Sequence, residues 1–498
     1  MGLNAQPPLI SSNTFFRQFG KTKKPLEIVA FLFCSLFYHM DLLKEFLKRN
    51  REKKLKIHVA GDIMIDEYYD VKVSRISPEM PMPVMSSAND WAVRKPGGAA
   101  NVAYQFRHFN VQLGLMCWCD ELGKTVLTDH EIPWGHPISS QICKLPIKRR
   151  FLDNGIQVVR HDIETPLCGL DEHIVDYSTL KLKDMISKSF YPEVAILSDY
   201  DKGFFSSEEH NVLDYYRAAK TIIDPKHGPL SKWKGCTVFK PNAKEAYELT
   251  KRNHWKEQAK HLQNELECKS VVITFGGEKV AGVDGSDFFM FKPSRAVVAE
   301  SVVGAGDCFA AFLAMSVGHG FSAAEAAEIA WNAGANYVTN KRNRPITPSE
   351  LSLDGLVEPE DLVNRDYKLV FTNGCYDILH EGHIKTLEFA KSKGDKLVVA
   401  LNSDASVKKH KGDTRPIKPL DQRVAVMKAL RMVDFVVIFD EDTPLELIKK
   451  IQPDVLVKGA GYCIDTVVGS DVVPEVFIAP TVGTLSTTGF LSCGKCKI

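Results

Sequence analysis

The segment FTNGCYDILHEGH, residues 371–383, places His380 and His383 three positions apart. It follows an apolar run with strand character and precedes apolar residues at helical spacing. Two imidazoles beside the free N–H groups of a helix start can stabilise charge that develops on a triphosphate during attack at its α-phosphorus. Gly382 leaves room for the phosphates to approach. The segment therefore predicts nucleotidyl transfer, with His380 and His383 as its catalytic pair.

A zinc site is the alternative interpretation of these histidines, with Cys375 as a third ligand. Gly382 and the strand–turn–helix context have no role in a zinc site, so phosphate binding is favoured. The Cys493/Cys496 pair has no second pair or nearby histidine to complete a zinc set. The twelve cysteines are scattered along the chain, which is typical of reduced thiols rather than a disulfide framework.

A second chemical signal is SVVGAGDCFAAFLA, residues 301–314. Gly304, Ala305 and Gly306 precede an apolar helix, so their N–H groups form an anion site at its positive end. Asp307 lies at the mouth of that site. A carboxylate beside phosphate is unfavourable unless it takes a proton or meets a metal, so we predict that Asp307 deprotonates a substrate hydroxyl. A plain helix cap is the alternative.

Two further segments predict ligand contacts. In KPNAKEAYEL, Asn242 and Glu245 are placed to hold Mg²⁺, directly or through water, beside nucleotide phosphates, and this role is compatible with a capping box. In KPGGAANVAYQF, Gly97 and Gly98 allow close backbone approach to a ligand, and the Asn101 amide can bind hydroxyls. A tight strand–helix turn is the simpler interpretation of the glycine pair.

A basic cluster in the same half, Lys148, Arg149, Arg150 and Arg160, can clamp the phosphate of a sugar phosphate. A solvated basic face is the alternative.

These residues need a scaffold that brings strand ends together. Strand-like runs recur at residues 194–200, 221–225, 236–242 and 270–277, with helical segments between several of them. This alternation predicts βαβ units and a parallel sheet with helices on both faces. A basic amphipathic helix is expected over 41–55, with an apolar stripe of Leu42, Leu43, Phe46 and Leu47.

The chain is expected to contain two domains. A polar, proline-containing stretch separates the first block from a second α/β block with strand-like runs at 395–404, 433–441 and 453–461. The predicted boundaries are an N-terminal extension over 1–40, a first domain over 41–345, a linker over 346–366 and a second domain over 367–498.

Composition excludes several classes of protein. Of 498 residues, 44 % are hydrophobic and 25 % charged, and the net charge is +1, which does not mark a nucleic-acid binder. The apolar segment 25–40 is short for a membrane span and lacks a clear cleavage site. We therefore expect an N-terminal extension, a cytoplasmic location and no stable membrane insertion; a weak membrane anchor is the alternative.

The first block resembles the ribokinase-like sugar kinases. The segments GDIMIDEYY, SRISPEMPMPV, PGGAANVA, LSDYDKGFF, DPK, KPNAKE and GAGD occur in the order seen in that family, and SRISPEMPMPV is similar to its heptose-phosphate kinase branch. The resemblance covers roughly residues 57–345. It implies a parallel sheet with a small β-lid and Asp307 as catalytic base. It also implies an ATP site that includes Ala243 and Lys244, and a sugar site that includes Asp66. The residues at 301–303 depart from the family pattern, which bears on monovalent-cation support.

The second block is similar to the cytidylyltransferase-like nucleotidyltransferases, which carry H-x-G-H after a T-x-G-x-F/Y-D turn. This chain has both, followed by LNSDASVKKHKGDTRPI. The expected fold is a smaller doubly wound domain. Beside the histidines, the nucleotide site is expected to comprise Thr372, Asn373, Gly374, Asp377, Lys411, Arg415, Arg423, Lys458, Ser486, Thr487 and Thr488. Gly461 replaces the usual carboxylate of that family.

Together the two blocks resemble the bifunctional heptose-7-phosphate kinase/heptose-1-phosphate adenylyltransferases. The resemblance implies phosphorylation of heptose 7-phosphate at C1 and, after a separate phosphatase, adenylyl transfer that forms ADP-heptose for lipopolysaccharide core or other glycans. ATP, heptose phosphates, Mg²⁺, a monovalent cation and a homodimer formed through the kinase domain are the implied partners. A single active domain beside a structural one, and a CDP-forming transferase, are the alternatives.

Overall fold

The computed structural model describes residues 40–87, 91–133, 138–139, 144–164, 191–205, 212–226, 228–292, 299–339, 344–352, 355–460 and 462–480. The chain divides into two compact units, Met1–Ile346 and Thr347–Ile498. Each unit has its own sheet and core, and each is described by itself.

The first unit contains an eight-stranded sheet in the order β16-β15-β14-β13-β12-β11-β1-β6. Six strands are parallel, and β15 and β16 turn back as an antiparallel edge. The central strands are continuous Val/Ile-rich runs because both of their faces are covered. Their bounds are β1 (Leu55–Gly61), β6 (Val111–Met116), β11 (Val194–Ser198), β12 (Lys220–Asp224), β13 (Val238–Phe239), β14 (Ser270–Thr274), β15 (Val280–Asp284) and β16 (Asp287–Phe291).

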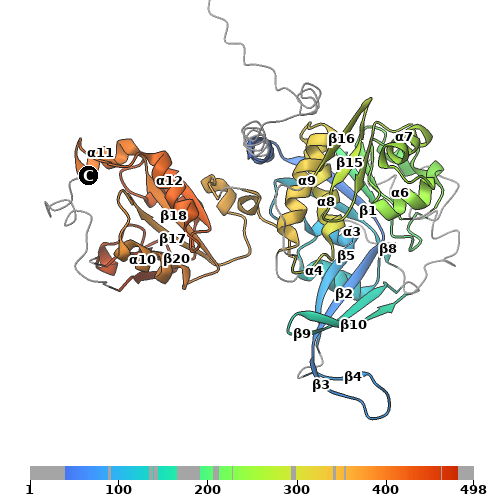
Figure 1. The fold of residues 1–498 in the computed structure, drawn as a ribbon, viewed down its shortest axis with the longest axis horizontal. Helices are drawn as coiled ribbons and strands as arrows, with labels where there is room; N and C mark the ends of the chain where they lie inside the picture. The colour runs from blue at the N-terminus through green and yellow to red at the C-terminus, as the bar shows by residue number, and fades with distance from the viewer. Residues whose placement is uncertain are drawn as a thin grey trace, which may run out of the picture. The chain divides into compact units, whose positions relative to one another are not determined.

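Helices cover both faces of this sheet, as the alternation predicts (Figure 1). Alternate strand residues such as Leu197 and Ile223 pack in one buried cluster with Ala246 and Leu262 from α6 and α7. Helices α3, α8 and α9 also pack on the sheet strands. The helices are α3 (Ala99–Tyr104), α4 (Glu121–Asp129), α6 (Ala243–Thr250), α7 (Trp255–Leu266), α8 (Ala305–Gly318) and α9 (Ala323–Tyr337), with 3-10 turns η1 (Val212–Tyr216) and η2 (Leu230–Trp233).

A second sheet forms the expected lid, in the order β10-β9-β2-β5. Its strands are β2 (Ile63–Asp70), β5 (Val93–Gly98), β9 (Ile147–Asp153) and β10 (Ile156–Ile163). β2 begins two residues after β1 ends, so the lid grows directly from the carboxyl edge of the main sheet. Two smaller pairs accompany it, β3 (Lys72–Ile76) with β4 (Pro83–Ser86) and β7 (Trp118–Cys119) with β8 (Ile138–Ser139).

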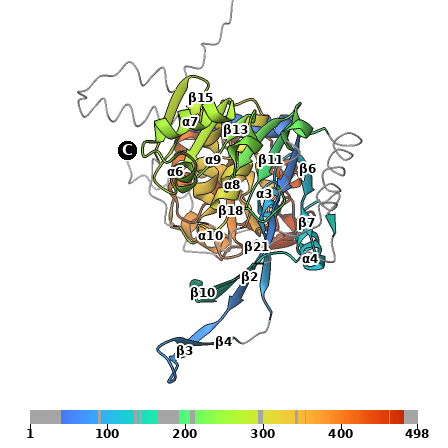
Figure 2. The same cartoon turned by 90° about the vertical axis from the view of Figure 1, so that its right-hand side faces the viewer.

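The pair β3–β4 is a ribbon that stands away from the rest of the first unit in both views (Figures 1 and 2). Its side chains include Ile76, Met80 and Met82, which are 62 %, 62 % and 53 % exposed. An apolar tip with this exposure is unusual for a surface that faces only water.

The amphipathic helix expected near the N-terminus is confirmed over residues 40–52. Its stripe of Leu42, Leu43, Phe46 and Leu47 is buried, with Phe46 fully inaccessible. Phe46 packs against aromatic rings of the first unit, among them Phe312 at 6.1 Å between centroids. The expected extension before this helix lies outside the described residues. Among the described residues, no helix is both long and apolar enough to cross a membrane.

The second unit contains a five-stranded parallel sheet in the order β19-β18-β17-β20-β21. The order reverses beside β17, and ligands of such sheets bind at the carboxyl ends of the strands at that point. Its elements are β17 (Leu369–Gly374), α10 (Glu381–Lys391), β18 (Lys396–Asn402), α11 (Asp404–Lys411), α12 (Leu420–Ala429), β19 (Phe435–Phe439), α13 (Leu445–Ile451), β20 (Val455–Lys458), η5 (Ile464–Thr466) and β21 (Glu475–Ile478). The predicted doubly wound domain is confirmed.

The segment 346–366, expected to be a linker, carries two short 3-10 helices, η3 (Pro348–Leu351) and η4 (Pro359–Leu362). Leu351 and Leu362 are fully buried, and the backbone N–H of Val357 donates to Val436 O of the edge strand β19. The division between the two units falls after Ile346, so this segment counts with the second unit. Although most of this segment is polar, its few apolar residues pack it against the second unit.

Candidate active sites

Asp307 lies in the first turn of α8, as the GAGD segment predicts. Gly304 precedes the helix with φ 78°, and a Cβ on it would stand 2.5 Å from both Asn101 Nδ2 and Tyr337 Oη. Only glycine tolerates this conformation and this crowding. The Ala305 N–H donates to Val302 O at 3.2 Å. The other N–H groups of the first turn lie at the positive end of the helix, so the start of α8 that Gly304, Ala305 and Gly306 form is placed to bind an anion.

The Asp307 carboxylate is buried and held on both sides. Asn101 Nδ2 donates to Oδ2 at 2.6 Å, and Tyr200 Oη donates to Oδ1 at 2.5 Å. Burial raises the pKa of Asp307 to about 6, against the two hydrogen bonds, which lower it, while Asp224 and Asp66 raise it further. A carboxylate with a raised pKa that still ionises near neutral pH is suited to act as a general base.

Asn101 does not point its amide freely at a sugar, as the sequence led us to expect. Its nitrogen is on Asp307 and its oxygen accepts from Gln105 Nε2 at 3.1 Å, so the amide is fixed as a donor to the carboxylate. The position still lines a small cavity with Asp66, Lys95 and Tyr104. Gly98 turns the chain into α3 with φ 61°, and Gly97 packs beside Met64 and the Asp66 carboxylate.

Asn242 and Glu245 form the capping box that the sequence allows. Asn242 Oδ1 accepts from Glu245 N at 2.9 Å, and Glu245 Oε2 accepts from Asn242 N at 2.8 Å. Glu245 Oε1 faces Lys226 Nζ at 3.4 Å. Both oxygens thus have partners, so Glu245 fits a Mg²⁺ ion through water better than by direct ligation. Ala243 and Lys244 follow in the first turn of α6, and the Lys244 side chain is 82 % exposed.

The basic cluster divides between the two faces of the lid. Lys148 and Arg150 alternate with Arg149 along β9, and register places Arg160 of β10 opposite Arg150. Arg150 forms a buried ion pair with Asp66, and burial lowers the pKa of Lys148. These three cations share one face of the lid.

Arg149 lies on the other face of the lid. Its Nε contacts Glu67 Oε2 at 2.7 Å, and Arg94 Nε contacts Glu67 Oε1 at 3.0 Å. Arg149 therefore satisfies a buried carboxylate and is unavailable to a ligand on the Asp66 face.

In the second unit, His380 is the N-cap of α10 and His383 lies in its first turn. The two rings stack, with centroids 3.9 Å apart, and Tyr376 lies 5.1 Å from the His383 ring. Burial lowers the pKa of His383 to about 4, and His380 and Lys411 lower it further. A backbone hydrogen bond with Ile378 acts in the opposite direction. His383 is therefore neutral at pH 7 and carries one N–H rather than a full charge.

The strand beside the histidines carries the other predicted residues. Thr372 is buried, and Gly374 lies against the Tyr376 ring. Asn373 Oδ1 accepts from Lys458 Nζ at 2.7 Å across the neighbouring strand ends of β17 and β20. Burial lowers the pKa of Lys458 to about 8. The Lys458 ammonium therefore lies at the point where the strand order reverses, which is where ligands of such sheets bind.

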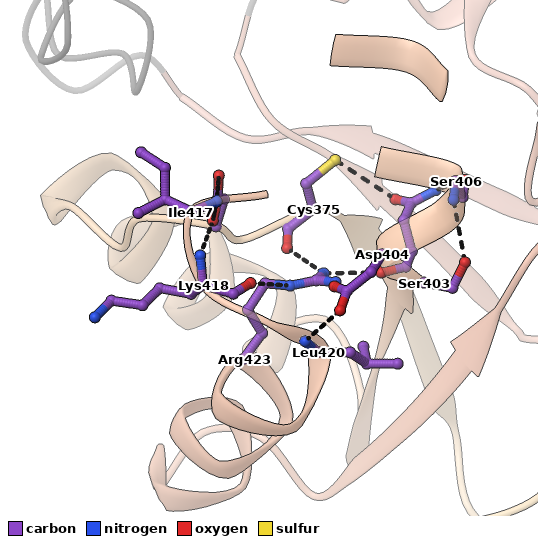
Figure 3. A network of polar contacts seen from close by, with 10 residues as sticks. Cys375, Ser403, Asp404, Ser406, Ile417, Lys418, Leu420 and Arg423 are labelled. Carbon is purple, nitrogen blue, oxygen red and sulfur yellow. Dashed lines mark hydrogen bonds and ion pairs between the residues drawn. The ribbon is translucent and has the colours of Figure 1, made fainter. Parts of the chain in front are cut away.

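Arg423 takes a different place from the phosphate contact we expected (Figure 3). It is 2 % exposed, and its guanidinium donates to three carbonyl oxygens, those of Cys375, Asn402 and Lys418. It also pairs with Asp404 at 2.7 Å. Arg423 thus ties the ends of β17 and β18 to the basic loop before α12.

Asp377 also holds the basic loop before α12 in place. Its carboxylate accepts from the N–H groups of Ile417 and Lys418 and pairs with Arg415 at 2.7 Å. Lys411, at the end of α11, remains exposed. Of the predicted loop cations, Lys411 is therefore the one that the structure leaves on the surface.

The remaining predicted residues, Gly461 and Ser486, Thr487 and Thr488, lie outside the described residues. For the zinc alternative, the described ranges contain no group of three or more His, Cys, Asp or Glu side chains placed to hold a metal. The Cys375 thiol faces Asn402 Oδ1 at 3.8 Å.

Sequence reasoning missed three site residues of the first unit. Tyr200 contacts Asp307, and Lys240 Nζ forms a buried ion pair with Asp224 at 2.9 Å. Asp224 ends β12, Lys240 follows β13 directly, and Tyr200 lies two residues after the end of β11. Polar residues gather at this ligand-binding edge of the main sheet. Their position at the ends of apolar strand runs was the feature of the sequence that could have identified them.

Comparisons with known proteins agree with this architecture. The profile of the pfkB family carbohydrate kinases matches residues 209–349, and that of the cytidylyltransferase-like family matches 371–475. A protein named bifunctional protein HldE from Campylobacter jejuni subsp. doylei is 37 % identical over 454 residues, which cover 87 % of this chain and 95 % of the relative. The chain belongs to the HldE family of bifunctional proteins.

Other HldE proteins are similar over the same extent. That of Campylobacter concisus is 37 % identical over 88 % of this chain and 97 % of its own length. The predicted pairing of a sugar kinase with a nucleotidyltransferase in one chain is thereby confirmed. Phosphofructokinase-2 from Escherichia coli in complex with potassium covers 60 % of this chain and 97 % of its own, with 16 % identity and a TM-score of 0.49, too distant to bear on the substrate.

Proposed function

We propose that the first unit of this HldE protein transfers the γ-phosphoryl group of ATP to the C1 hydroxyl of heptose 7-phosphate. The second unit transfers the adenylyl group of ATP to heptose 1-phosphate, which gives ADP-heptose and pyrophosphate. The observation that carries the kinase half is the buried Asp307 carboxylate, held by Asn101 and Tyr200 beside the anion-binding start of α8.

In the kinase step, Asp307 takes the proton of the C1 hydroxyl as that oxygen attacks the γ-phosphorus. The new O–P bond forms while the bond to the bridging β,γ-oxygen breaks, and ADP leaves. The N–H groups at the start of α8 stabilise the charge of the phosphoryl group in transit. Mg²⁺ bound with ATP supplies charge neutralisation, and Glu245 would hold it through water.

The 7-phosphate is assigned to the Asp66 face of the lid. Arg150, Lys148 and Arg160 lie together on this face, and Asp66 balances only part of their charge. Arg160 also pairs with Asp162, from which a phosphate dianion can displace it. The arrangement selects a sugar that carries phosphate at the end remote from C1.

In the adenylyl step, an oxygen of the sugar 1-phosphate attacks the α-phosphorus of ATP and pyrophosphate leaves. The attacking group is already ionised, so no protein base is needed. His380, His383 and Lys458 donate to the phosphate oxygens on which charge develops. Lys411 is assigned to the departing phosphates because it is exposed and lies close enough to His383 for its charge to lower the pKa of that histidine.

We further assign a cytoplasmic location, Mg²⁺ with both ATP molecules and a monovalent cation near the altered segment 301–303. A homodimer through the kinase domain is supported by the exposed apolar ribbon β3–β4, because a second copy would cover Ile76, Met80 and Met82.

Incubation of the full chain with heptose 7-phosphate and Mg-ATP tests the proposal by mass spectrometry. We expect a heptose bisphosphate first, and ADP-heptose only after a phosphatase that removes the 7-phosphate is added. CTP in place of ATP in the second stage is the matched control and should give no nucleotide sugar. Absence of bisphosphate contradicts the kinase assignment, and CDP-heptose in the control contradicts the adenylyl assignment.

A further inference from the structure

Tyr200 touches the candidate base of the kinase site although it lies 107 positions away in the sequence. Its phenol oxygen donates to Asp307 Oδ1 at 2.5 Å, so the segment after β11 contacts the first turn of α8. Asn101 holds the other oxygen, Oδ2, at 2.6 Å. The two donors come from different elements and fix the plane of the carboxylate.

Asp62 holds the loop that carries Tyr200. It follows β1, is 2 % exposed, and accepts three backbone hydrogen bonds. The donors are the N–H groups of Tyr200 at 2.9 Å, Lys202 at 3.1 Å and Phe204 at 3.0 Å. A buried carboxylate with three backbone donors is a rigid anchor. Asp62, which follows a strand of the main sheet, thus fixes the position of the Tyr200 phenol.

The hydrogen bond from Tyr200 leaves the base able to work. Each carboxylate oxygen has two acceptor positions, and Oδ1 and Oδ2 each use one for Tyr200 and Asn101. A substrate hydroxyl can therefore reach Asp307 while both donors stay in place. Without the phenol, Asp307 would keep one fixed oxygen and could rotate about its last torsion.

We propose that Tyr200 is a positioning residue of the kinase reaction: its phenol, set by Asp62, holds the Asp307 carboxylate in the orientation that accepts the substrate proton. This inference rests on the proposed role of Asp307.

The charges around Asp307 define what loss of the phenol would do. Burial and the carboxylates Asp224 of β12 and Asp66 of β2 raise the pKa of Asp307, and the bonds from Tyr200 and Asn101 lower it. The charge of Asp307 raises the pKa of Lys240, which follows β13. Lys148 of β9 lies 5.7 Å from the centre of the Tyr200 ring. None of these groups is replaced when the hydroxyl is removed. The carboxylate would then bind its proton more tightly, so its pKa would rise.

The substitution Tyr200→Phe in the full chain tests this inference. We expect the acid limb of kcat/KM for the kinase reaction to move up by about one pH unit. At pH 7 the higher pKa alone should lower the kinase rate by about twofold. A further loss should persist at pH 8.5, because the carboxylate is no longer held in its orientation. The substrate phosphates titrate identically with both enzymes, so the difference reports the protein. Adenylyl transfer to heptose 1-phosphate should stay within about twofold.

Tyr216→Phe is the matched control, because the Tyr216 hydroxyl is also buried but bonds to His58 Nδ1 at 2.6 Å. It should leave the acid limb in place, whatever its effect on Tm. An unchanged acid limb in Tyr200→Phe, or a wild-type rate at pH 8.5, overturns the inference. Asp307→Asn is measured in parallel: if it keeps wild-type kinase activity, the proposed base itself is wrong, which separates the two failures.

Discussion

The two candidate sites hold their central side chains in opposite ways. In the first unit, both oxygens of Asp307 accept hydrogen bonds from the protein, from Asn101 and from Tyr200. In the second unit, His380 and His383 stack on each other, and the buried Nδ1 of His380 has no hydrogen-bond partner among the described residues. The protein alone holds the Asp307 carboxylate, whereas the histidine pair has a buried polar atom that a ligand would satisfy.

The chemistry of each step explains the difference. A sugar hydroxyl must lose a proton, so the kinase needs a carboxylate with a raised pKa in a fixed orientation. A sugar phosphate needs no base, so the second unit needs only donors at the phosphate. Burial supports both: it raises the pKa of Asp307 to about 6 and lowers that of His383 to about 4, so the first can take a proton and the second stays neutral.

The largest expected effect is that of Asp307→Asn. Loss of the general base should lower kinase kcat by about 10²- to 10⁴-fold and leave adenylyl transfer within about twofold. Separate assays with heptose 7-phosphate and heptose 1-phosphate measure the two steps. Asp214→Asn, at a carboxylate that is 54 % exposed, is the control and should change neither. Equal loss of both activities would show that the substitution unfolds the chain, and then the comparison of the sites would fail.

His383→Ala should have the next largest effect, in the other half. Loss of one preorganised donor is expected to lower adenylyl kcat by about 10²- to 10³-fold, because the charge on the phosphates would develop without it. Release of pyrophosphate measures the step. The control is His410→Ala, since His410 is 42 % exposed and lies 4.0 Å from Asp442. An adenylyl rate within about threefold of wild type would contradict the role of the histidine pair.

Arg423→Gln should have a smaller effect on rate and a clear one on stability. Three backbone carbonyls and Asp404 lose their donor, so we expect the second unit to be destabilised by about 2–4 kcal/mol. KM for ATP in adenylyl transfer should rise about tenfold as the basic loop loosens, with the kinase unchanged. Urea unfolding and both assays measure this. Arg431→Gln, at an exposed arginine after the same helix, is the control; if both variants behave alike, Arg423 does not anchor the loop.

Much of the fold follows from the sequence. The strand runs at 194–200, 221–225 and 270–277 form the parallel sheet of the first unit, and those after residue 395 form that of the second. These predictions succeed because a buried parallel strand needs a continuous apolar run and a helix needs its 3.6-residue period, and both patterns are local. The start of α8 and the cap of α10 are local in the same way, since a few adjacent residues determine each.

The sequence by itself placed Asp307 and His383 at helix starts, because neighbouring residues determine where glycine turns and helix caps form. Only the tertiary structure decided which partners each side chain meets. Arg150 and Arg149 are adjacent, yet strand register sends one to Asp66 and the other to Glu67. Tyr200 reaches Asp307 across 107 positions. Such contacts depend on how strands pair and loops return, and residue type alone does not encode them.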